Sequence, residues 1–157
     1  MDPNQNAHEW VWQKLGTYLS DHDCKDTQPR RTIIEYFLNH PDQQHVSAEQ
    51  VHQSLKDQGH KLGLATVYRS LNLLVDADIL EQHHFQNDKA VYELKYPEGH
   101  HDHLVCLDCG DIKEFEDEYI EERQQEIAMK LGFDLASHRL ELFGHCKQKS
   151  CPSKTSS

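Results

Sequence analysis

The sequence has no long apolar run. No stretch of its 157 residues approaches the ~18 to 20 uninterrupted apolar residues of a membrane helix. The start of the chain lacks the apolar centre of a secretory signal peptide. Glycine and proline are scarce, with 7 and 5 residues, which excludes collagen-like and low-complexity proteins. We therefore expect a soluble globular protein of the cytoplasm with no membrane partner.

Positive charge is also scarce. The chain has 16 Lys and Arg against 27 Asp and Glu, a formal net charge of −11. Residues 1–85 carry 7 basic and 12 acidic groups, and residues 86–157 carry 9 and 15. Neither part is a basic module that binds nucleic acid by charge alone. DNA binding would need local basic groups, together with bound cations that offset the negative charge.

Histidine and cysteine, in contrast, are abundant. Five of the 13 His fall between His83 and His103, a clustering that indicates metal binding. Five cysteines in a chain without a secretory signal are more typical of ligands or redox groups than of a disulfide framework. Four of them pair by spacing, Cys106 with Cys109 and Cys146 with Cys151, and Cys24 stands alone.

The first part of the chain predicts a winged helix. Apolar residues recur at helical spacing in four segments. These are residues 7–20, a segment from Thr27 as N-cap to His40, one from Ser47 with capping-box spacing to Gly59, and residues 64–75. Residues 79–85 and 90–96 then flank a turn-rich segment and predict a β-hairpin. Three helices followed by a hairpin is the element order of a winged helix.

The composition changes at residues 97–99, which predict a hinge. Beyond it we expect strands over 103–107 and 112–115, a helix over 117–131, and a last strand running to Cys146. The helix would turn Ile120, Ile127, Ala128 and Leu131 inward. Such a β-β-α-β unit has a sheet edge to cover, so we expect pairing with a second copy. The predicted fold class is α+β, with a winged-helix domain over 1–96 and a small α/β domain over 100–157.

The cysteine spacing predicts a structural zinc site. Two residues between Cys106 and Cys109 let one tight turn present both thiolates to an ion, and Cys146 with Cys151 would complete a tetrahedron. A closed four-thiolate site leaves no position for a substrate, which argues against catalytic zinc. The alternatives are an inert or disulfide-forming set and a thioredoxin-like redox pair. The redox pair is disfavoured because Cys106 does not open a helix within a βαβ unit.

The run at residues 100–103 predicts two further metal sites. On an extended segment His101 and His103 face one way, and His100 and Asp102 face the other. The candidate partners are Glu93 and Glu114 for the first pair, and Glu121 and His138 for the second. Mixed imidazole and carboxylate ligands suit iron, zinc, manganese or cobalt. The alternative is a solvated polar turn.

The segment 64–75 is the candidate DNA-reading helix, because Thr66 and Arg69 are turned away from its apolar face. Arg69 can bond a phosphate or a guanine edge, and Tyr68 can lie against a thymine methyl. Lys25 and Arg30, ahead of the second helix, would contact phosphate or the minor groove. The alternative is an ordinary amphipathic helix.

Four stretches carry a resemblance to the ferric uptake regulator (Fur) family of bacterial metal-dependent repressors. They are residues 27–30, TQPR; 45–49, HVSAE; 63–69, GLATVYR; and 100–110, HHDHLVCLDCG. The resemblance covers about residues 24–151. It implies a homodimer with an N-terminal winged helix and a C-terminal α/β dimerisation domain. The implied function is repression of iron-uptake genes on palindromic A·T-rich DNA, by dimers or pairs of dimers.

The resemblance also implies site residues. It places structural zinc on Cys106, Cys109, Cys146 and Cys151, a sensing site on His45, Glu93, His101, His103 and Glu114, and an additional site on His100, Asp102, Glu121 and His138. The implied DNA contacts are Lys25 in the minor groove, and Tyr68 and Arg69 on the reading helix, to which the helical pattern adds Thr66. One departure from the family pattern is an extra residue between Glu93 and the histidine run, which lengthens the hinge.

The identity of the sensed metal depends on individual ligand residues. Peroxide-sensing members of the family have aspartates where Glu93 and Glu114 stand, so two glutamates favour Fe(II), with Mn(II), Zn(II) or Co(II) as substitutes. Zinc-, manganese- and nickel-sensing relatives share the fold and remain alternatives. An alternative from another functional class is a zinc hydrolase with Glu93 or Glu114 as general base, but the sequence shows no motif for stabilising an oxyanion. A metal-storage protein would explain the metal ligands but not the role of Arg69. We therefore expect no enzyme, but a repressor in which one ion bridges the two domains.

Overall fold

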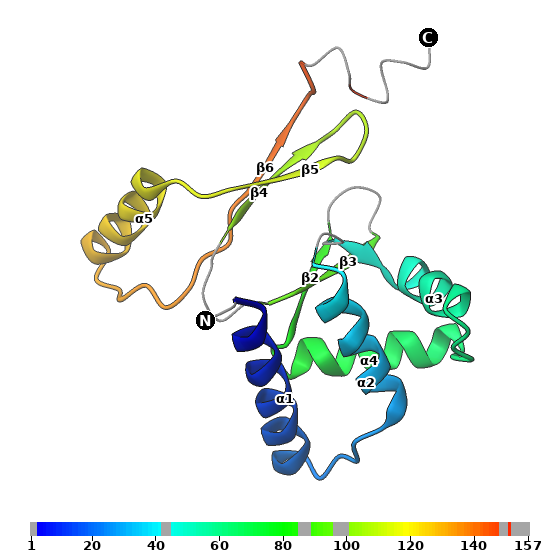
Figure 1. Ribbon diagram of the computed structural model, residues 1–157. Helices are drawn as coiled ribbons and strands as arrows, with labels where there is room; N and C mark the ends of the chain where they lie inside the picture. The colour runs from blue at the N-terminus through cyan, green and yellow to red at the C-terminus, as the bar shows by residue number, and fades with distance from the viewer. Residues whose placement is uncertain (1–2, 42–44, 85–88, 96–100, 148–150, 152–157) are drawn as a thin grey trace. The chain divides into compact units, whose positions relative to one another are not determined.

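The computed structural model describes residues 3–41, 45–84, 89–95, 101–147 and 151. The chain forms two compact units, Met1–Glu98 and Gly99–Ser157, which are described separately here (Figure 1). The hinge predicted at 97–99 lies outside the described residues. Within the described ranges, no helix combines the length and the apolar character required to cross a bilayer.

The first unit contains four helices. They are α1 (Pro3–Asp21), α2 (Gln28–Asn39), α3 (Ala48–Asp57) and α4 (Leu64–Asp76). Ser47 begins α3 with a capping box, in which its hydroxyl accepts from the Gln50 N–H at 3.2 Å and the Gln50 side chain accepts from the Ser47 N–H at 2.8 Å. Ile33, Val51 and Leu71 lie fully buried in one core, each on its own helix. All four predicted helices are present.

A three-stranded antiparallel sheet completes the first unit. Its strands are β1 (Val46–Ser47), β2 (Leu80–His84) and β3 (Ala90–Leu94), in the order β1-β3-β2. The hairpin of β2 and β3 is the one that the sequence predicts. β1 was not predicted, because two residues are too few to show a periodicity.

The second unit has the predicted β-β-α-β order. Its elements are β4 (Asp102–Cys106), β5 (Ile112–Phe115), α5 (Glu118–Lys130) and β6 (Glu141–Gly144). β4 lies in the centre of the sheet, antiparallel to β5 and parallel to β6. The parallel pairing requires a crossover, which α5 supplies. With the winged helix, this arrangement confirms the predicted α+β fold class.

The structure differs from prediction on α5. None of its residues is buried, and Ile127 and Leu131 are 46% and 69% exposed, although the sequence predicts both to face inward. The last strand also ends at Gly144, before the predicted end at Cys146. The helical periodicity correctly predicts an apolar face, but a single copy of this small unit does not bury it.

Candidate metal sites and DNA-reading helix

The first cluster of ligand side chains lies on the small sheet of the winged helix. β1 pairs with β3 so that Val46 lies opposite Tyr92, and the next pair in this register is His45 with Glu93. On the other side of β3, His83 lies opposite Val91. Since alternate residues of a strand share a face, His83 and Glu93 are diagonal neighbours on one face. The sheet register therefore brings His45, His83 and Glu93 together.

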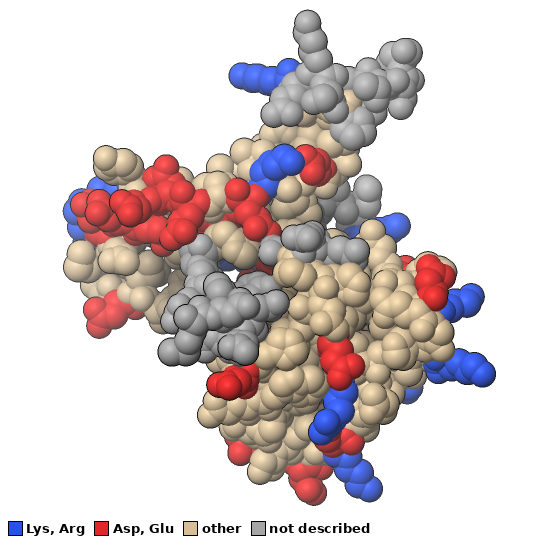
Figure 2. Space-filling model, viewed as in Figure 1, with Lys and Arg blue, Asp and Glu red and all other residues tan. Residues whose placement is uncertain are grey.

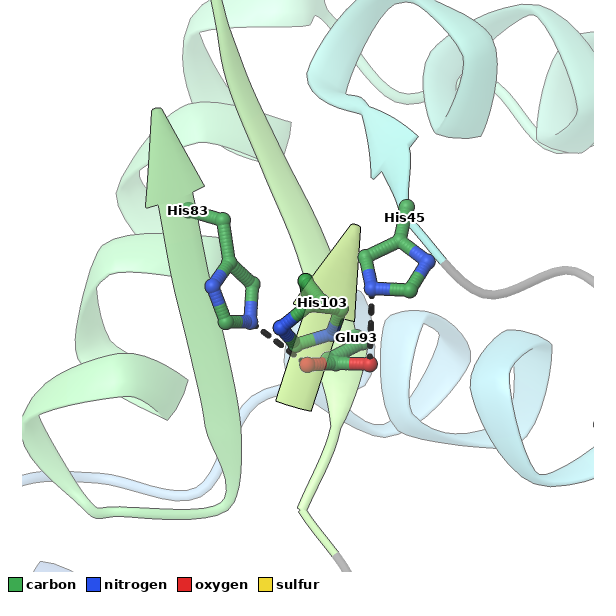
Figure 3. Close-up of side chains that lie close together, drawn as sticks. All are labelled: His45, His83, Glu93 and His103. Atoms are coloured by element: carbon green, nitrogen blue, oxygen red, sulfur yellow. Dashed lines mark hydrogen bonds and ion pairs between the residues drawn. The ribbon is translucent and has the colours of Figure 1, made fainter. Parts of the chain in front are cut away.

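The three side chains meet at the Glu93 carboxylate (Figure 3). His83 Nε2 lies 2.5 Å from Glu93 Oε1, and His45 Nε2 lies 3.1 Å from Glu93 Oε2. His45 holds a left-handed backbone conformation with φ 61°. Non-glycine residues rarely adopt this conformation, and it costs roughly 1–3 kcal/mol when the surrounding structure imposes it. Such strain is typical of a functional site.

His83 was missed by the sequence analysis. The signal that could have found it is the hairpin: once its two strands are aligned, a histidine on one strand is diagonal to Glu93 on the other. That alignment depends on the loop length, which periodicity does not determine.

The second unit carries its own ligand cluster on β4 and β5. His103 lies opposite Glu114 in the register of the two strands. His101 Nε2 is 3.8 Å from Glu114 Oε1, and the rings of His101 and His103 are 5.1 Å apart. The three side chains share one face, as alternation predicts.

The opposite face of β4 holds another group. Asp102 is buried, and its Oδ1 lies 3.6 Å from His138 Nε2, which lies 3.1 Å from Glu121 Oε1. α5 supplies Glu121, and the segment before β6 supplies His138. Their ligand atoms lie within 4.8 Å of one another. His100, predicted as the fourth member, lies outside the described residues.

Three of the four predicted zinc ligands converge. The sulfur atoms of Cys106, Cys109 and Cys151 lie within 4.8 Å of one another, and Cys146 is not in this group. A backbone hydrogen bond from Asp111 lowers the pKa of Cys109, but the two neighbouring thiols and desolvation outweigh it and raise this pKa to about 11. Thiols crowded in this way favour a cation that would hold them as thiolates.

Asp108 connects the turn between Cys106 and Cys109 to the end of β6. Its Oδ2 accepts from the Cys146 backbone N–H at 3.0 Å, and its Oδ1 lies 2.9 Å from His145 Nδ1. This carboxylate therefore brings the Cys146 backbone to the turn that carries the first two thiols.

α4 presents the predicted DNA-contacting side chains. Arg69 is exposed, and its guanidinium donates to Thr66 Oγ1 at 3.3 Å. The Tyr68 hydroxyl donates to Glu49 Oε1 at 2.6 Å. This bond lowers the pKa of Glu49 and raises the pKa of Tyr68, so the pair stays ionised at Glu49 and neutral at Tyr68 near pH 7. Glu49 on α3 thus orients an aromatic ring of the predicted reading helix.

Of the two other basic groups predicted to contact DNA, Lys25 lies ahead of α2, whereas Arg30 lies in its first turn. Lys25 is exposed, and its backbone carbonyl accepts a hydrogen bond from the Arg30 guanidinium. In the second unit, Figure 2 shows acidic side chains gathered over α5, which carries Glu118, Glu121, Glu122 and Glu126. A helix of this charge repels phosphate, so the surface charge favours the first unit as the DNA-binding one.

Comparison with known proteins agrees with this arrangement. The model of the ferric uptake regulator family matches residues 21–143. The ferric uptake regulation protein of Vibrio parahaemolyticus is 51% identical over 133 residues, which are 85% of this chain and 88% of that protein.

Solved structures are similar over most of the chain. The ferric uptake regulator of Vibrio cholerae, whose crystal structure reveals a structural rearrangement of the DNA-binding domains, is 51% identical with a TM-score of 0.71, covering 82% of this chain and 96% of that one. The regulator of Helicobacter pylori, which has three functional metal-binding sites, is 29% identical with a TM-score of 0.76, covering 88% and 91%.

Proposed function

Because the chain belongs to the ferric uptake regulator family, it is a metal-responsive transcription regulator and not an enzyme, and we propose that it represses iron-uptake genes when it binds Fe(II). The family predicted from four short stretches is therefore confirmed, and the hydrolase alternative is wrong. The observation that carries the proposal is a set of ligands divided between the two units.

The proposed sensing site takes His45 and Glu93 from the first unit, and His101, His103 and Glu114 from the second. In each unit the sheet register gathers its own share of these side chains. An ion bonded to both shares restricts the units to one arrangement. If DNA binds this arrangement better, metal and DNA reinforce each other's binding through a single coupling free energy. The rearranged DNA-binding domains of the Vibrio cholerae regulator support such movement in a relative.

The proposed DNA contacts are Arg69, Tyr68 and Thr66 on α4, with Lys25 before α2, on a palindromic A·T-rich operator. The exposed guanidinium of Arg69 and the oriented ring of Tyr68 suit base edges and phosphates. Each bound divalent ion would also offset two of the eleven excess negative charges.

Two further metal sites accompany the sensing site in this proposal. Zinc would be held by Cys106, Cys109, Cys146 and Cys151, where it would stabilise the end of the sheet without taking part in sensing. The additional site would use His100, Asp102, Glu121 and His138. The convergence of three thiols and the close approach of His138 to two carboxylates support both. The three functional metal sites of the Helicobacter pylori regulator are a parallel in a relative.

We propose that the second unit forms a homodimer. Among the described residues, eleven large apolar side chains are exposed, and all but Leu64 belong to this unit. They include Tyr119, Met129 and Phe133, at 83%, 66% and 69% exposure. An apolar surface of this kind requires a partner, and a second copy satisfies it by symmetry. Pairs of dimers on DNA and the cytoplasmic location stay predictions from sequence.

The bridging mechanism is tested by removing a ligand from either unit. We compare His45→Ala with His103→Ala in an anaerobic Fe(II) titration, measuring operator affinity by fluorescence anisotropy at constant salt. Both variants should keep their zinc and their dimeric state, and both should need at least roughly tenfold more Fe(II) for equal DNA occupancy. His84→Ala, an exposed histidine on β2, is the matched control and should respond like the parent. A normal metal response of His45→Ala beside a defective His103→Ala would refute bridging. Mn(II), Zn(II) and Co(II) titrations test the preference for iron.

A further inference from the structure

The winged-helix unit carries one more ligand side chain than the proposed sensing site uses. His83 lies within the sheet, and its side chain is 2% exposed. Its Nε2 approaches one oxygen of Glu93, while His45 approaches the other (Figure 3). We propose that the winged-helix unit binds a divalent ion by itself through His45, His83 and Glu93. This inference deepens the proposed function, on which it rests, because two of these ligands belong to the proposed sensing site.

The geometry suits one ion shared by the three side chains. Ligand bonds of about 2.0–2.2 Å place neighbouring donor atoms about 3 Å apart in an octahedral site and about 3.4 Å apart in a tetrahedral one. His45 Nε2 lies at such a separation, 3.1 Å from one Glu93 oxygen, and His83 Nε2 lies closer, 2.5 Å from the other. The rings of His45 and His83 are 5.7 Å apart and tilted by 59°, so the two imidazoles approach the carboxylate from different directions. Three potential ligand atoms, which lie within 4.8 Å of one another, are therefore gathered on one sheet face.

The chemistry of the donors selects the kind of ion. Two imidazoles and one carboxylate suit Fe(II), Co(II), Zn(II) and Mn(II), and Fe(II) sites with this ligand set retain open coordination positions. Three protein ligands are also fewer than the four to six that these ions accept. An ion held on the winged helix would thus still accept ligands from His101, His103 or Glu114.

The position of His83 gives this site a degree of preorganisation. Because His83 and Glu93 are fixed by the β2–β3 register, two of the three ligands are in place whenever the hairpin is folded. His45 is fixed by the strained backbone before β1. Little ordering free energy remains to be supplied on metal binding. An ion can consequently bind to the winged helix without prior engagement of the second unit.

The test uses the full, zinc-loaded chain without the ligands of the second unit. The background variant combines His101→Ala, His103→Ala and Glu114→Ala with His138→Ala, which also removes the proposed additional site. Co(II) is titrated and followed by its visible d–d absorption and by equilibrium dialysis. We expect one Co(II) per chain in this background. Absence of Co(II) binding would overturn the inference.

The role of His83 is tested within this background. His83→Gln retains an amide that can hydrogen-bond to Glu93, and it should weaken Co(II) binding by at least the roughly tenfold that even an indirect metal partner contributes. His84→Gln, one residue further along β2 and exposed, should have no effect. Equal affinity and an unchanged spectrum for His83→Gln would show that His83 only positions Glu93, and would overturn the assignment.

A second measurement leaves His83 intact. In the Co(II)-loaded background, each coordinating imidazole gives a hyperfine-shifted, exchangeable ring N–H signal in the proton NMR spectrum. We expect two such signals, from His45 and His83. A single signal would overturn the inference even if His83→Gln failed to fold. Neither result depends on DNA. Bridging is instead tested by the operator affinity of single-ligand variants, so failure of the winged-helix site is distinguishable from failure of bridging.

Discussion

At the scale of single residues, Arg69 is the clearest candidate for contacting DNA. It lies exposed on α4, and its bond to Thr66 is long, at 3.3 Å. A guanidinium that exchanges such a bond for a guanine edge or a phosphate gains two parallel hydrogen bonds. Tyr68, one residue earlier, is instead fixed by its bond to Glu49.

We predict that Arg69→Ala weakens operator binding by about 1–3 kcal/mol, because it removes a base or phosphate contact. Affinity is measured by gel shift at one stated salt concentration, since phosphate contacts depend strongly on salt. Arg123→Ala removes the same charge from α5 and should leave affinity unchanged. Unaltered binding by Arg69→Ala would mean that α4 does not read the operator.

At the scale of elements, a turn connects α1, α4 and the β2–β3 hairpin. Asp78 follows α4 with φ 56°, accepts from Lys95 at 2.6 Å, and also bonds Lys14 of α1. Burial raises the pKa of Asp78, but the bonds to Lys14 and Lys95 outweigh it and leave this pKa below its ordinary 3.8. The ionised form is therefore favoured by folding.

We predict that Asp78→Asn lowers the free energy of unfolding at pH 7 by no more than ~1 kcal/mol, since the ion pairs are largely exposed. Asparagine tolerates the left-handed backbone, so the turn is retained. The difference from the parent should be constant above the ordinary pKa of 3.8 and vanish as the pH falls through the lower folded value. Urea unfolding across pH measures this difference, with Asp76→Asn as control. A difference in unfolding free energy that grows on acidification would contradict a stabilising role of the ionised Asp78.

At the scale of the whole molecule, the second unit lacks a complete core of its own. Its helix buries no residue between Glu118 and Lys130, and its sheet has β5 and β6 as edges. Zinc at the cysteines and a second copy against the apolar surface would compensate for this deficit.

We predict that Cys109→Ser loses both the zinc and the dimer, because the thiol cluster closes the end of the sheet that carries the dimer surface. Metal analysis and sedimentation velocity measure the two effects together. Cys24→Ser removes a cysteine of the first unit and should retain both. Full zinc retention in Cys109→Ser would contradict the assignment of Cys109 as a zinc ligand. A zinc-free dimer would show that dimerisation does not depend on the zinc.

The sequence alone determined the features that depend on neighbouring residues. The four helices, the hairpin, the capping box at Ser47 and the opposite faces of His101 and Asp102 all follow from spacing within a few residues, since helices and strands have fixed periods. The stretches shared with the ferric uptake regulator family identified the function for the same reason, as local motifs.

Only the tertiary structure decided which distant residues meet. His45 reaches Glu93 through the register of a two-residue strand, and His83 joins them across the hairpin. The exposure of α5 likewise reverses the inward face that its periodicity predicts. Strand register and burial are set by pairings far apart in the chain, and a local period fixes the face of a residue but not what covers it.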